Sequence, residues 1–122
     1  MTRAALAVAT IGLGLGSGVY ADELQVREQF RAGYEARANG SPYLLSLENH
    51  VTDHVLPCES GYLLDPPGYY LGLAQFEPGT WQKARRAPDS DYRDAWEQGW
   101  ATAQWISMID DPAGRAGWGC WS

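Results

Sequence analysis

The stretch SPYLLSLENHVTDHVLPCESG, residues 41–61, decides the fold. Ser41 followed by Pro42 is typical of a helix N-cap and the first helical position. Apolar residues then recur every three or four positions, as a buried helix face requires: Leu44, Leu47, Val51 and Val55. Because Pro57 lacks a backbone N–H, it should kink or end this helix. We therefore expect a core helix that brings residues 58–61 to its C-terminal edge.

A narrower helix is predicted upstream, over residues 22–39. Asp22 with Gln25 has the pattern of a capping box, and Asn39 with Gly40 is typical of a helix end. The apolar residues of this helix form a single stripe: Val26, Phe30 and Tyr34. Such a helix either docks on the rest of the domain or extends away from it.

Two more helices are predicted downstream. One begins at Pro78 and runs toward Arg86. The other runs from Asp91 to about Ile109 and stops before Pro112. Its tryptophans are expected mainly in the core: Trp96, Trp100 and Trp105.

Residues 61–75 read as a cluster of turns. Pro66, Pro67 and Gly68 precede a short aromatic run over 69–73, which forms either a small hairpin or an irregular loop. The glycine-rich tail, residues 113–122, should order only if a cross-link ties it down. The predicted fold class is therefore mainly α, a small helical domain with a minor sheet or none.

Length and composition narrow the classes of function. The chain has 122 residues, which is room for one hydrophobic core. Its formal charge of −6 leaves no basic face for a phosphate backbone, so nucleic acid is excluded as a partner. Six tryptophans and seven tyrosines are too many for a disordered chain.

The N-terminus has the pattern of a secretory signal peptide. Arg3 gives a positive start, an apolar run of small residues follows over 4–18, and residues 19–21 resemble a signal peptidase site, with cleavage after Ala21. The alternative is an uncleaved membrane anchor, which needs roughly 20 apolar residues, more than this run supplies. We expect residues 1–21 to be removed and residues 22–122 to be secreted, without stable membrane insertion.

Export changes how the two cysteines are interpreted. Outside the cytosol, a pair of thiols in a small domain is usually oxidised, so Cys58 and Cys120 should form a disulfide. The alternative is two buried free thiols. Without a CxxC pair or a third cysteine, a structural zinc site is not supported.

Glu59 is the candidate catalytic residue. It sits at a predicted helix end beside a predicted disulfide, where a carboxyl can be partly desolvated. Desolvation raises the pKa of a carboxylic acid, and cleavage of a glycosidic bond needs a protonated acid at neutral pH. The alternative is an exposed carboxylate at a helix end. His50 and His54 are four apart but lack the Glu of the zinc protease signature, so we expect no metal site.

Several ordered pieces of the chain resemble one family. They are CESG at 58–61, GYYLGLAQF at 68–76, GTW at 79–81 and GWGC at 117–120. Together they look like the resuscitation-promoting factors and soluble lytic transglycosylases of the lysozyme superfamily, over residues 44 to 121. The chain departs from that pattern after Gly61, where Tyr62 and two leucines replace two glycines and an aromatic residue.

The resemblance implies an α+β lysozyme-like fold with an active-site cleft, formed by residues 41–122 as the catalytic domain, with residues 22–40 as a lead-in helix. It implies cleavage of the β-1,4 bond between N-acetylmuramic acid and N-acetylglucosamine, with Glu59 as general acid and then base and with no cofactor or metal. The substrate-binding residues it implies are Tyr69, Tyr70, Gln75, Thr80 and Trp81. Glu77, next to the stretch at 68–76, is a further candidate, and its alternative is an acidic residue before a helix N-terminus, where the helix dipole favours it. For Gln75 the alternative is an amide that holds a loop, and for Trp81 it is a core aromatic residue.

The number of catalytic acids separates two mechanisms. A hydrolase with two acids would draw its second carboxylate from Asp65, Glu77 or Asp53. Transglycosylases of this superfamily work with one Glu, because the substrate's N-acetyl group and 6-hydroxyl replace the second acid and water. A cell-wall-associated monomer acting on peptidoglycan strands is expected, and a peptidase partner is left open. The alternative function is a noncatalytic peptidoglycan-binding or signalling module with the same aromatic cleft.

Overall fold

The computed structural model describes residues 18–122, with side chains from residue 22, and is mainly helical. The elements are α2 (Gly18–Ala38), α3 (Pro42–His50), the π-helical turn η2 (Val51–Val55), α4 (Leu56–Glu59), α5 (Pro78–Ala84), α6 (Ala95–Met108) and the 3-10 turn η3 (Gly119–Trp121). The described residues contain no strand, only one antiparallel bridge between Leu71 and Phe76. The prediction of a mainly helical domain with one disulfide is confirmed.

The predicted signal peptide lies outside the described residues, apart from the backbone of residues 18–21. This backbone forms the first turn of α2, so α2 does not begin at a capping box on Asp22. The structure corrects that prediction: Asp22 lies inside a helix that is already under way. None of the described helices is both long enough and apolar enough to cross a membrane.

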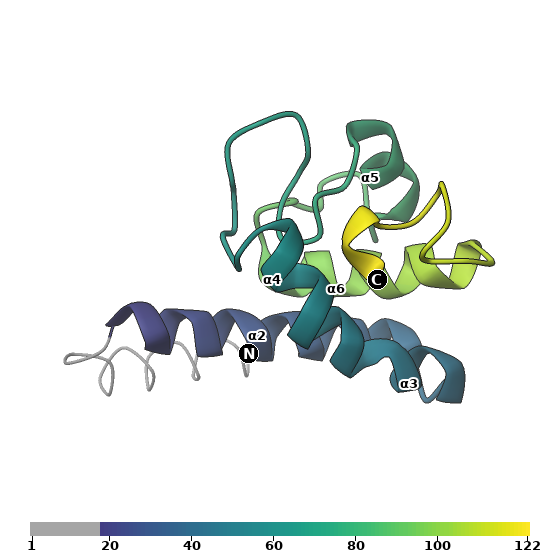
Figure 1. Ribbon diagram of the computed structural model, residues 1–122, viewed down its shortest axis with the longest axis horizontal. Coiled ribbons are helices and arrows are strands. Elements are labelled where there is room, and N and C mark those ends of the chain that lie inside the picture. The colour runs from purple at the N-terminus through teal and green to yellow at the C-terminus, as the bar shows by residue number, and fades with distance from the viewer. Residues whose placement is uncertain (1–17) are drawn as a thin grey trace.

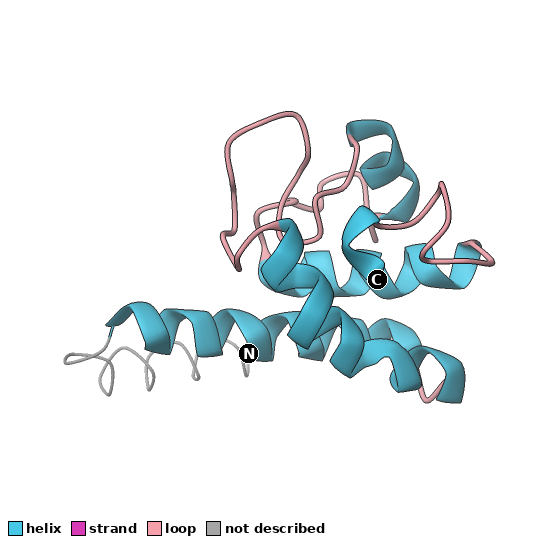
Figure 2. Cartoon of the chain, in the orientation of Figure 1, coloured by secondary structure: helices cyan, strands magenta, loops and turns pink. Residues whose placement is uncertain are grey.

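Helix α2 docks on α6, which resolves the two alternatives for the upstream helix (Figure 1). The crossing is close because each helix offers a glycine. A Cβ built on Gly33 would lie 1.9 Å from the carbonyl oxygen of Trp96, and one built on Gly99 would lie 2.0 Å from that of Phe30. Phe30 and Tyr34 are fully buried beside this crossing. The two helices therefore form the base of the domain, and the long loops gather on the side away from α2 (Figure 2).

The core helix over 42–59 carries a π-helical turn that accommodates Pro57. Ser41 caps its start by accepting a hydrogen bond from the Leu44 N–H, as predicted. In η2 the Leu56 N–H reaches back five residues to the carbonyl of Val51. Pro57 has no N–H to give to the next carbonyl in that series, that of Thr52. This carbonyl accepts instead from the Tyr62 hydroxyl at 2.6 Å and from Arg27 at 3.3 Å.

The long downstream helix begins later than the sequence suggested. Asp91 accepts a hydrogen bond from the backbone N–H of Arg93, and this local turn competes with helix formation. Asp94 is the N-cap instead, because its side chain accepts from the Glu97 N–H at 3.1 Å. Helix α6 therefore starts at Ala95 rather than Asp91.

The glycine crossing generates a stability prediction. At an open helical position Gly→Ala should stabilise by about 0.5–1 kcal/mol, because alanine has the higher helix propensity. Gly33→Ala should instead destabilise by about 2–3 kcal/mol, since the new methyl group collides with the α6 backbone. Urea denaturation measures the difference. The control is Ala32→Ser on the exposed face of α2, which should change stability by about 0.5 kcal/mol or less; a stabilised Gly33→Ala would contradict the close crossing.

Glu48 of α3 generates a pH prediction. Its side chain is buried, and Arg31 of α2 lies 3.4 Å away. Burial, and secondly the neighbouring Glu35 carboxylate, raise the pKa of Glu48 from 4.5 to about 7, although Arg31 acts in the opposite direction. Between pH 4.5 and about 7, Glu48 therefore keeps its proton in the folded protein and loses it in the unfolded chain. The free energy of unfolding should fall as pH rises from about 4.5 to 7, by up to about 3 kcal/mol from this group.

Chemical denaturation at a series of pH values tests this contribution. Glu48→Gln keeps the shape of the side chain and removes its titration, so the decline between pH 4.5 and 7 should flatten. Glu28→Gln, at an exposed position on α2, is the matched control and should retain the wild-type slope. Identical pH profiles for the wild type and Glu48→Gln would show that Glu48 titrates normally in the folded state.

Candidate active site

Glu59 is the last residue of α4, and the sequence after it explains why the helix stops there. Ser60 is the C-cap, and its N–H bonds to the carbonyl of Leu56. Gly61 has φ +60°, the left-handed conformation that commonly ends a helix and that glycine adopts without strain. The Ser60 hydroxyl is buried and accepts from the Tyr62 N–H at 3.2 Å. The segment 58–61 is therefore a helix stop that leaves the Glu59 carboxylate, half-buried, at the end of the core helix.

The C-terminal segment is fixed across this helix end. Cys120 forms the predicted disulfide with Cys58, and its backbone N–H donates to Oε2 of Glu59 at 3.2 Å. The next residue, Trp121, is held through its carbonyl by Nε2 of His50, whose ring also stacks on His54. The described residues contain no group of three or more potential metal ligands. His50 anchors the C-terminal segment through Trp121.

A tight turn over residues 71–76 forms the opposite wall. Leu71 and Phe76 exchange two backbone hydrogen bonds, so the predicted aromatic run ends in a minimal hairpin of one bridge. Gly72 and Gln75 have positive φ angles of 72° and 54°. The fully buried side chain of Gln98 in α6 holds this turn from below, because its amide bonds to Ala74 N–H and to the carbonyls of Leu71 and Tyr92.

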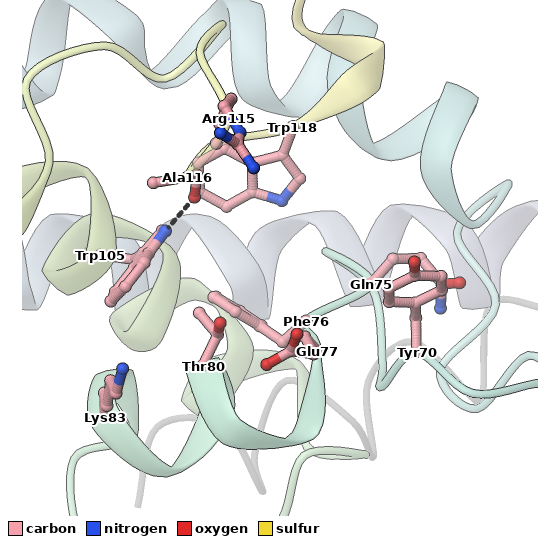
Figure 3. A pocket seen from close by; sticks show the side chains of 11 residues that line it. Tyr70, Gln75, Phe76, Glu77, Thr80, Lys83, Trp105, Arg115, Ala116 and Trp118 are labelled. Carbon is pink, nitrogen blue, oxygen red and sulfur yellow. Dashed lines mark hydrogen bonds between the residues drawn. The ribbon is translucent and has the colours of Figure 1, made fainter.

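Between these walls lies a cleft with two connected arms. The Glu59 arm, about 340 Å³, is lined by Glu59, Gly119, Cys120 and four residues that it shares with the second arm. The Lys83 arm, about 470 Å³, is lined also by residues of α5, α6 and the loop before η3 (Figure 3). The shared residues are Tyr70, Gln75, Gly117 and Trp118. The two arms therefore lie next to each other along the cleft.

The predicted substrate-binding residues divide into three groups. Tyr70 and Gln75 line both arms, and the Gln75 amide also donates to the carbonyl of Gly72, so this side chain holds its own loop as well. Glu77 and Thr80 line the Lys83 arm. Tyr69 is exposed and packs edge-on against Tyr70, but it lines neither arm.

Trp81 lies in the core rather than in the cleft. It is 4% exposed, and its ring packs 5.7 Å from that of Phe76. Phe76 in turn contacts the ring of Trp118, whose indole N–H donates to the carbonyl of Ala74. Trp81 therefore supports the cleft from behind and offers no open face to a sugar, as the core alternative for this residue expects.

The three candidates for a second catalytic carboxylate lie in different parts of the fold, and none of them lines the Glu59 arm. Asp53 lies on the exposed side of η2 and pairs with Arg27 of α2 at 3.0 Å. Asp65 is exposed in the loop that follows α4 and lines neither arm. Glu77 lines the Lys83 arm only, so Glu59 is the one carboxylate among the residues that line the Glu59 arm.

Sequence reasoning missed part of the cleft. Trp105 packs against the core, as expected, but its half-buried ring also lines the Lys83 arm and its indole N–H donates to the carbonyl of Ala116. Lys83 and Arg115, also in this arm, were not singled out. The helical spacing of Gln98 and Trp105, seven residues apart, places both on one face of α6 and could have indicated that this face meets the loops.

Comparison with known proteins gives no match: no family model, no curated protein and no solved structure is significantly similar to the chain.

The hydrogen bonds of the Gln98 amide should be needed for the stability of the turn that forms one wall of the cleft. Gln98→Met keeps the size of the side chain but leaves a buried N–H and two carbonyls without their partner, which should destabilise the fold by about 3 kcal/mol or more. Thermal unfolding followed by tryptophan fluorescence measures the loss. Gln82→Met at an exposed position of α5 is the matched control, and equal melting temperatures for the two variants would show that Gln98 does not hold the turn.

Proposed function

We propose that the protein is a secreted glycosidase that cleaves the β-1,4 bond between N-acetylmuramic acid and N-acetylglucosamine in peptidoglycan, with Glu59 as its acid. The proposal includes the lysozyme-like character of the helical domain that the sequence motifs suggest. The disulfide supports export, because such bonds persist mainly outside the cytosol. In this proposal the protein is a monomer that is associated with the cell wall and needs no cofactor.

The observation that carries the proposal is the isolation of Glu59 within an open cleft. Its Oε2 is held by the Cys120 N–H, whereas Oε1 has no hydrogen-bond partner among the described residues. The carboxylate is thus oriented by the protein and still has one oxygen available to a ligand. A carboxyl placed in this way beside Tyr70 and Trp118 can, when protonated, donate its proton to the oxygen of a sugar bound in the arm.

The single carboxylate in the Glu59 arm favours chemistry with one acid. Glu59 donates its proton to the bridging oxygen as the C1–O bond breaks, and the substrate's own N-acetyl oxygen bonds to C1 in place of a second acid. The Glu59 carboxylate then takes the proton of the 6-hydroxyl, whose oxygen attacks C1 and releases the N-acetyl group. The products are a free 4-hydroxyl on one strand and a 1,6-anhydro sugar on the other, and no water is consumed.

The proposal predicts separate outcomes for two carboxylates of the cleft. Glu59→Gln cannot donate a proton, so release of soluble fragments from purified peptidoglycan should fall about a thousandfold. Glu77→Gln, the matched control in the other arm, should retain activity within about fivefold, because a group that does not take part in proton transfer contributes less. Chromatography with mass detection measures both rates, and circular dichroism shows whether the variants are folded.

Two other results would change the assignment. Loss of activity in both variants would indicate an acid pair and hydrolysis. No release of fragments by the folded, oxidised wild type, together with retained binding to peptidoglycan, would identify the chain as the noncatalytic binding module. Equal activity of the wild type and Glu59→Gln would remove Glu59 from the mechanism.

A further inference from the structure

Lys83 and Arg115 differ from every other cation in the part of the chain that the structure describes. Neither has a hydrogen-bond or ion-pair partner among the described residues. The other arginines bond to protein oxygens: Arg27 to Asp53, Arg31 to Glu48, Arg37 to Gln104 and Ser107, Arg85 to the carbonyl of Pro88, Arg86 to Glu97 and Arg93 to Asp91. The unpartnered cations are thus the exception in a chain with a formal charge of −6.

These two cations line the same arm of the cleft. Lys83 comes from the last turn of α5 and Arg115 from the loop before η3, and Figure 3 shows them on opposite sides of the Trp105 ring. Both are exposed and therefore remain solvated and free to bind. Glu77 is the only carboxylate among the residues that line this arm, so the cations outnumber it.

We propose that the Lys83 arm binds a carboxylate of the peptidoglycan strand, next to the glycosidic bond that Glu59 cleaves. This inference rests on the proposed function and adds a specificity to it. A guanidinium group matches the two oxygens of a carboxylate, and an ammonium group adds a mobile point charge. The carboxylate comes either from the stem peptide or from the lactyl group of muramic acid that carries no peptide; the chemistry is the same.

The position of the two arms side by side agrees with a carboxylate bound next to the glycosidic bond at Glu59. Tyr70, Gln75 and Trp118 line both arms, so a strand that presents its bond to Glu59 lies next to the arm that holds Lys83 and Arg115. An acidic protein is repelled by an anionic wall polymer over long distances. Two local cations at the cleft offset this repulsion where the strand binds. They also select strands with carboxylates over neutral N-acetylglucosamine polymers.

Binding is measured with the full oxidised chain carrying Glu59→Gln, so that strands are not consumed. Three soluble probes are compared by calorimetry: peptidoglycan oligomers with stem peptides, the same oligomers after amidase removes the peptides, and an N-acetylglucosamine oligomer. Lys83→Gln and Arg115→Gln each remove one charge from the arm. Arg93→Gln removes the same charge at an exposed position outside the cleft and is the matched control. Lys83→Arg keeps the charge.

Each arm variant should bind carboxylate-bearing strands about tenfold more weakly than the parent, and Lys83→Arg and Arg93→Gln should bind like the parent. A loss confined to peptide-bearing oligomers identifies the stem peptide as the source of the carboxylate. A loss that appears only after amidase treatment identifies the lactyl group, whose carboxylate is free only once the peptide is removed, and a loss on both oligomers shows that the arm binds either carboxylate. Binding of the N-acetylglucosamine oligomer should be unchanged in all variants.

Equal affinities of Lys83→Gln, Arg115→Gln and Arg93→Gln for every carboxylate-bearing strand would overturn the inference. So would an equal loss on the neutral oligomer, because that indicates a structural role for the two side chains. Failure of the proposed function has a different signature. In that case the arm variants still lose affinity, but the chain with Glu59 intact releases no fragments from peptidoglycan.

Discussion

The attachment of Cys120 to the end of the core helix is the constraint on which the cleft depends. One residue makes two bonds there, a disulfide to Cys58 and a hydrogen bond from its N–H to Glu59. The disulfide closes a loop of 62 residues, which in the chain-entropy model stabilises a fold by roughly 4 kcal/mol. The hydrogen bond orients the carboxylate that the proposed chemistry uses. A single covalent link therefore both stabilises the small domain and completes its candidate site.

The rest of the molecule keeps the two walls of the cleft at a fixed separation. The glycine crossing of α2 and α6 forms a base in which side chains are excluded from the contact, so the distance between the helices is set by backbone. From α6 the Gln98 amide holds one wall and the Trp105 indole holds the other. Because a single helix supports both walls, a strand bound between them meets Glu59 and the Lys83 arm in a fixed relation.

Much of the fold, but less of the site, follows from the sequence. Helical periodicity and the Ser41 cap predict the core helix, and two cysteines behind the pattern of a signal peptide predict the disulfide, because these signals are local or have one solution. The start of α6 was misplaced because the turn at Asp91 competes with helix formation. Trp105 was assigned mainly to the core because an aromatic residue on a helix packs or lines a cleft depending on what lies opposite, which is a tertiary property. Whether Lys83 has an ion-pair partner is also a tertiary property, so the sequence does not predict it.

In the proposed mechanism one carboxyl, Glu59, breaks the glycan without a second acid and without water. Digestion of purified peptidoglycan in heavy-oxygen water tests this most directly, because hydrolysis places a solvent oxygen on C1 and transfer to the 6-hydroxyl does not. With Glu59 as the only acid, the fragments should end in 1,6-anhydro sugar and carry no label at the cleaved sugar. Labelled reducing ends would contradict it and would show that water, activated by another group, completes the reaction.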